Sequence, residues 1–170
     1  MKIIMLAIVW LVLAASLVVS SDAQNGDTEA FGRLKSLAGD WTANTPKGKI
    51  QTHYEVVSGG SAVLERFESA ELGADNVMVT VYYMNGGHLQ LTHYCMAHNQ
   101  PHMQAESFDP AIRELRFAFL NATGLATPEA GHMHNANFRF IDANHFATDW
   151  QFYESGKPKF DESVQYTRVQ

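Results

Sequence analysis

Apolar and polar side chains alternate with a period of two through most of the chain after residue 41. This alternation is typical of β-strands that bury one face, because successive strand side chains point to opposite sides. Short clusters of Gly, Pro, Asn, Asp and Ser interrupt the alternation and indicate turns. The pattern predicts about ten strands. They lie near residues 41–45, 50–58, 62–68, 77–84, 87–95, 102–108, 112–120, 132–141, 145–154 and 160–168.

A helical pattern precedes these strands. Phe31, Leu34 and Leu37 recur at the spacing of one helix face, and Gly39 suits the position that follows a helix end. We therefore expect one short helix before the first strand. The sequence shows no second long helix, internal repeat or low-complexity segment.

Short antiparallel strands with tight turns favour a meander that closes into a barrel, since closure removes exposed strand edges. A two-sheet sandwich is the alternative. A barrel of about ten strands is wide enough to leave an interior cavity, whereas about eight strands leave little room. The predicted fold class is therefore all-β, an antiparallel barrel with a short N-terminal helix.

The first residues show the pattern of an export signal. Ile3–Val19 is almost wholly apolar, and Ser21–Ala23 supplies small residues at the two positions that a signal peptidase reads. We predict a signal peptide over residues 1–23 and a barrel domain over 24–170, in a protein that is periplasmic or secreted. An uncleaved membrane anchor is the alternative; after cleavage we expect no membrane contact.

Net charge limits the classes of binding partner, and cysteine content limits how the fold is stabilised. The chain has 12 Lys and Arg against 18 Asp and Glu, a formal net charge of −6, and no basic run. Nucleic-acid binding needs a clustered basic face, so we expect no nucleic-acid partner. Cys95 is the single cysteine and cannot form an internal disulfide, so stability must come from the core. The oligomeric state is not indicated.

The strand expected over residues 87–95 carries an imidazole and a thiol beside apolar side chains. Leu89, Leu91, His93 and Cys95 fall on alternate positions and therefore share one face. In a soluble barrel the apolar face is the inner one. We therefore predict that His93 and Cys95 point into the barrel.

A second strand repeats this arrangement. His132 and His134 share a face with Phe138 and Phe140, whereas Met133 is expected to point away from them as a packing residue. The two imidazoles are roughly 7 Å apart at the backbone. We predict that this pair and the His93–Cys95 pair converge in one cavity.

Four motifs carry a resemblance to known families. Gly39-Asp40-Trp41 after a short helix resembles the Gly-x-Trp opening of the lipocalin and calycin superfamily, in which the Trp packs across one barrel end. Thr92-His93-Tyr94-Cys95, Asn99-Gln100-Pro101 and His132-Met133-His134 resemble a family of exported bacterial lipocalin-like proteins with no assigned activity. The resemblance implies a lipocalin-like barrel and export, and no chemistry. The strand count is also similar to the fatty-acid-binding and nitrobindin-like branch, but Thr42–Thr45 lacks the Gly-rich continuation found there, so haem binding is not implied.

These observations lead to one predicted function and two alternatives. We expect non-catalytic binding of a small, partly apolar ligand in the barrel. The expected binding residues are His93, Cys95, His132, His134, Phe117, Phe119, Phe138 and Trp150. One alternative is a metal- or haem-binding protein, in which the two His and Cys pairs ligate zinc or copper. The other is a small barrel enzyme of isomerase or hydrolyase type, in which a His acts with Glu65 or Glu106.

Overall fold

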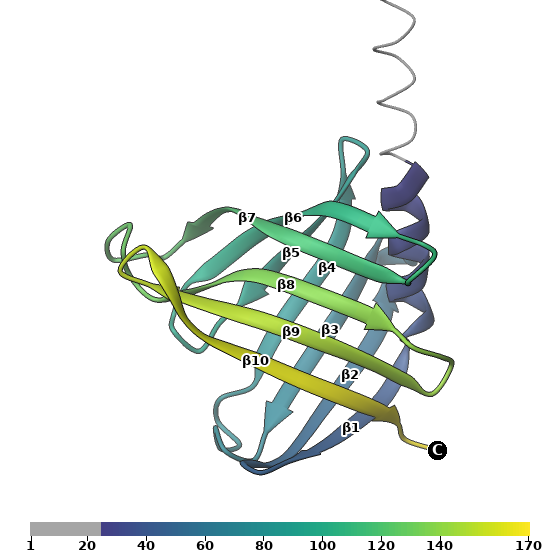
Figure 1. Ribbon diagram of the computed structural model, residues 1–170, viewed down its shortest axis with the longest axis horizontal. Helices are drawn as coiled ribbons and strands as arrows, with labels where there is room; N and C mark the ends of the chain where they lie inside the picture. Colours follow the sequence, from purple (N-terminus) through teal and green to yellow (C-terminus); the bar gives the residue numbers. More distant parts are fainter. Residues whose placement is uncertain (1–24) are drawn as a thin grey trace, which may run out of the picture.

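The computed structural model describes residues 25–170, which form a closed antiparallel β-barrel of ten strands (Figure 1). Each strand pairs with its neighbours in the sequence, and the first strand pairs with the last. The strands are β1 (Gly39–Thr45), β2 (Gly48–Val57), β3 (Ala62–Ser69), β4 (Met78–Asn85), β5 (His88–Tyr94), β6 (Gln100–Asp109), β7 (Glu114–Thr123), β8 (His132–Phe140), β9 (His145–Glu154) and β10 (Lys157–Arg168), with a short 3-10 turn, η1 (Ser58–Gly60), between β2 and β3. The predicted all-β barrel is confirmed. The predicted signal segment lies outside the described residues.

The predicted short helix is present at residues 25–36, and it lies across one end of the barrel (Figure 1). Its buried face consists of Ala30, Phe31 and Leu34. Near its start, the buried Asp27 carboxylate accepts a hydrogen bond from the Leu89 backbone N–H at 3.1 Å. Apolar burial and this bond together hold the helix on the barrel. Within residues 25–170, no helix is long and apolar enough to cross a membrane.

Trp41 closes the same end of the barrel. Its indole is 1% exposed and donates from Nε1 to the Leu37 carbonyl at 2.7 Å. The ring packs edge-to-face on Phe146, with centroids 4.7 Å apart, and the Arg168 guanidinium lies 4.1 Å from the ring centroid. Arg168 also donates to the carbonyl of Ser36, the last helix residue, and to that of Ala38, two residues later. Packed rings and a bridging arginine therefore close this end of the barrel.

The start of β8 departs from the expected alternation. A β-bulge lies between Met133, which pairs with Phe152, and Asn135, which pairs with Gln151. The extra residue, His134, shifts the side-chain pattern by one position. As a result Met133 lines the barrel interior, contrary to the prediction that it points away. Beyond the bulge the prediction holds, because Ala136, Phe138 and Phe140 are buried in the core.

Candidate functional site

A row of polar side chains crosses the barrel interior on four consecutive strands. Tyr54 of β2 pairs in register with Glu65 of β3, Glu65 with Thr80 of β4, and Thr80 with His93 of β5. All four side chains are buried. Register partners in antiparallel strands lie about 4.5–5.5 Å apart, so one row brings a carboxylate, two hydroxyls and an imidazole within hydrogen-bonding reach.

Glu65 is the centre of this row and is only 4% exposed. Its carboxylate accepts hydrogen bonds from Tyr82 Oη at 2.6 Å and from Thr52 Oγ1 at 3.1 Å. Burial raises the pKa of Glu65, while these hydrogen bonds stabilise the ionised form and oppose the rise. Burial, together with the nearby carboxylate, also raises the pKa of Tyr82 well above its usual value. Tyr82 therefore remains a proton donor to Glu65.

His93 is the one imidazole of this row. Its Nδ1 lies 2.9 Å from Thr80 Oγ1, while its Nε2 is buried and has no hydrogen-bond partner within residues 25–170. The direction of this bond decides which ring nitrogen carries the proton. Burial lowers the pKa of His93 to about 4, so the ring is neutral at pH 7 and Nε2 is a buried polar atom open to a hydrogen bond from a ligand.

The row borders a small cavity near the open end of the barrel. The cavity has a volume of about 30 Å³. Its walls are Glu65, Phe67, Met78, Thr80, His93, Met133, Trp150 and Glu162. The Trp150 and His93 ring centroids are 5.1 Å apart. This volume holds about two water molecules. A drug-sized ligand needs about 300 Å³ or more, so the cavity accepts a small head group rather than a whole ligand.

The residues predicted to share one site fall into three groups. His93 and Trp150 line the cavity, as described above. Phe117 and Phe138 belong to the hydrophobic core, with ring centroids 6.1 Å apart, and do not line the cavity. Cys95 is half-buried in the turn after β5 and does not line it either; burial raises the pKa of its thiol.

The third group is a stack of rings at the start of β8, where β8 does not pair with β7. His134 stacks on Tyr153, with centroids 3.9 Å apart, and on Phe119, at 4.6 Å. His132 Nδ1 lies 2.8 Å from the Ala130 carbonyl oxygen, and its Nε2 lies 3.1 Å from His134 Nδ1. Since a carbonyl only accepts, His132 donates from Nδ1 and accepts from His134. Both imidazoles are therefore held by aromatic contacts and by each other.

The predicted four-ligand metal site is not formed. Among residues 25–170, no group of three or more His, Cys, Asp and Glu side chains could hold a metal ion. The physical reason is the bulge in β8, which takes His132 and His134 out of the alternation that was expected to aim them at His93 and Cys95.

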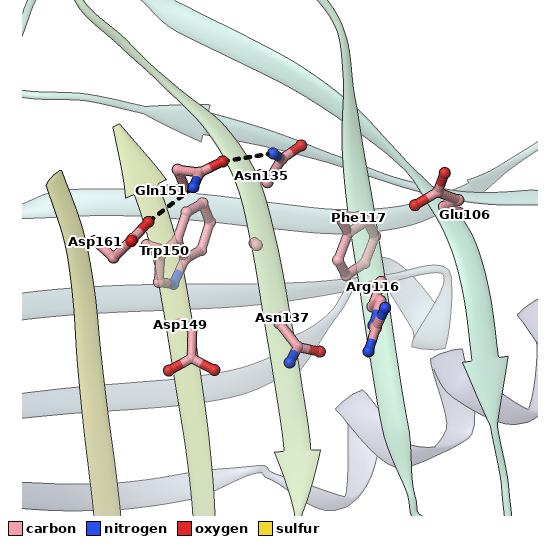
Figure 2. A pocket seen from close by; sticks show the side chains of 10 residues that line it. Glu106, Arg116, Phe117, Asn135, Asn137, Asp149, Trp150, Gln151 and Asp161 are labelled. Carbon is pink, nitrogen blue, oxygen red and sulfur yellow. Dashed lines mark hydrogen bonds between the residues drawn. The ribbon is translucent and has the colours of Figure 1, made fainter. Parts of the chain in front are cut away.

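Glu106, one of two carboxylates expected to act with a His, lies elsewhere. A register shift between Ala105 and Ser107 places it at a bulge of β6, where it is exposed. It lines a hollow of about 280 Å³ beside the outward-facing residues of β7–β10. Figure 2 shows this hollow, in which Asn135 donates to Gln151 and Gln151 donates to Asp161. Glu65, the other expected carboxylate, lines the same cavity as His93 and lies in the same row of register partners.

Sequence reasoning missed the groups that connect Glu65 to its surroundings. The alternation places the side chains of Thr52, Thr80 and Tyr82 on the inner face of their strands. The sequence does not state which of these residues face each other across neighbouring strands. Glu162 was missed because the residues before it in β10 are exposed. Comparison with known proteins adds no relative: no family model matches the chain, and no curated protein matches it.

Proposed function

We propose that this protein binds a small, partly apolar molecule at the open end of the barrel, with a hydrogen-bond donor of the ligand on His93 Nε2. The single observation that supports this function best is the buried and unpartnered Nε2 atom beside the cavity. A buried acceptor without a partner costs about 1–3 kcal/mol. A hydroxyl or amine group placed in the cavity removes this cost.

The walls of the cavity suit the apolar part of such a ligand. Phe67, Met78, Met133 and Trp150 surround the polar atoms, and the methionines can adapt their shape to what they contact. Small-molecule sites commonly combine apolar walls with a few fixed polar groups. Here the polar groups are fixed by the Glu65–Thr80–His93 row, so the orientation of the ligand head is set before binding.

The same row is also the geometry of a general base, with His93 oriented by Thr80 and Glu65. A general base works best when its pKa lies near the working pH. The pKa of His93 is lowered to about 4 by burial, so the imidazole is a weak base at neutral pH. Binding is therefore better supported than catalysis.

The binding proposal can be tested with 2-phenylethanol, a neutral probe with one hydroxyl donor and an apolar body. Titration of the full chain should change the fluorescence of Trp150, which lies beside His93. The change should be absent in Trp150→Phe. It should require at least about tenfold more probe in His93→Phe, which lacks the acceptor.

His53→Phe is the matched control, because His53 is an exposed imidazole of β2 outside the cavity. This variant should bind like the wild type. Equal affinity of the wild type and His93→Phe would contradict the proposal, as would the absence of any change that depends on Trp150.

A further inference from the structure

We propose that the ligand is a primary organic amine, which binds as its ammonium ion with the charged head in the interior cavity and its apolar body at the barrel mouth. This inference rests on the proposed binding function and names the chemical class of ligand. It starts from the polar atoms that border the cavity.

Carboxylate acceptors dominate the polar lining of the cavity. Its polar side chains are Glu65, Thr80, His93 and Glu162, and its walls include no Lys or Arg. Thr80 Oγ1 and His93 Nδ1 already bond to each other at 2.9 Å. A ligand that brings donors suits this lining, and an ammonium group brings three.

The charge near the cavity is negative. Glu65 and Glu162 approach it from β3 and β10, and His93 between them is neutral. Lys47 is close enough to act on Glu162, but its ammonium lies 3.5 Å from the Glu71 carboxylate, so this pair largely cancels. Burial raises the pKa of both Glu65 and Glu162, because it removes water from their charged forms. A bound cation compensates for that loss.

Size selects among cations. A primary ammonium group is about as large as a water molecule, and the 30 Å³ cavity holds about two of these. A trimethylammonium group has three additional carbon atoms and does not fit. The ring of Trp150 next to His93 also provides a π-face for a cation. The expected ligand is therefore a primary amine with an aromatic or aliphatic body.

Four probes with the same phenyl body separate these features by calorimetric titration of the full chain. They are 2-phenylethylamine, 2-phenylethanol, 3-phenylpropanoate and the N,N,N-trimethyl derivative of the amine. We expect the amine to bind at least about tenfold more tightly than each of the other three. Glu162→Gln should remove most of the preference for the amine over the alcohol.

Asp161→Asn is the matched control, because Asp161 is the neighbouring carboxylate of β10 and bonds to Gln151 outside the cavity. It should keep the amine preference. An alcohol that binds as tightly as the amine would overturn this inference and leave the binding function intact. A trimethylated amine that binds equally well, or a preference that survives Glu162→Gln, would overturn it too. If none of the four probes binds, both this inference and the proposed binding function are wrong.

Discussion

Replacing His93 by Phe should flatten the pH dependence of folding stability between about pH 6.5 and pH 4. In the folded protein, burial lowers the pKa of His93 from its ordinary value of 6.5 to about 4. Between these pH values His93 binds a proton in the unfolded chain and stays neutral in the folded chain. The free energy of unfolding of the wild type therefore falls as the pH falls through the window. Above it the imidazole is neutral in both states and adds no slope.

The size of this effect follows from the displacement of the pKa. One pKa unit corresponds to about 1.36 kcal/mol, so the interval from 6.5 to about 4 corresponds to about 3 kcal/mol across the whole window. The effect arises because a charged imidazole would lie among Trp150, Met78 and Met133 in a site that cannot hydrate it. Other titrating groups contribute equally to the wild type and the variant and cancel in their difference.

The assay is urea unfolding followed by circular dichroism at about pH 7, 6, 5 and 4, with the exposed-histidine variant His53→Phe as control. The wild type and His53→Phe should each lose about 3 kcal/mol more than His93→Phe between the highest and lowest pH. Parallel pH profiles for the wild type and His93→Phe would refute the reasoning. They would mean that His93 takes up its proton as readily in the folded state as in the unfolded state.

Three further predictions concern the barrel ends. Trp41→Ala should lower the free energy of unfolding by about 3–5 kcal/mol, since it removes a buried ring that packs under Arg168; an unchanged melting curve would argue against a sealed end. Asn99→Ala removes the 2.8 Å bond from Asn99 Nδ2 to the Gly131 carbonyl, so proteinase K should cut the β7–β8 loop faster than in the wild type. Equal cleavage rates would show that this bond does not hold the loop. Cys95 should react with Ellman's reagent more slowly than free cysteine at about pH 8, because burial raises its pKa; equal rates would contradict that burial.

The fold could be predicted because strand alternation and turn residues are local properties. The strand expected over 62–68 is β3 at Ala62–Ser69, and the one expected over 145–154 is β9 at His145–Glu154. The helix and the Gly39-Asp40-Trp41 motif also lie where the sequence placed them. Each of these features depends on neighbours within a few residues.

The candidate site could be predicted only in part, because it depends on register and on one irregularity. His93 was expected inside the barrel and lies there, since β5 alternates without interruption. That Glu65 and Thr80 stand beside it follows from the pairing of β3, β4 and β5, which no single strand encodes. The bulge after Met133 exchanges the inward and outward positions on one side of it relative to the other. The sequence carries no Gly or Pro at that point that would indicate a bulge.

The seam of the barrel has a consequence for how the chain folds and opens. β1 and β10 pair through only two register positions, Trp41 with Arg168 and Thr42 with Thr167, whereas β9 and β10 share ten. Neighbouring strands can pair soon after their turn forms, but the seam must join residues from opposite ends of the chain, which makes closure a late and slow step. The same short pairing makes the seam the first place where the closed sheet should open by fluctuation. Amide protons along the seam should therefore exchange with solvent before those of β9, and the hydrogen bonds from Arg168 to the carbonyls of Ser36 and Ala38 should slow that exchange.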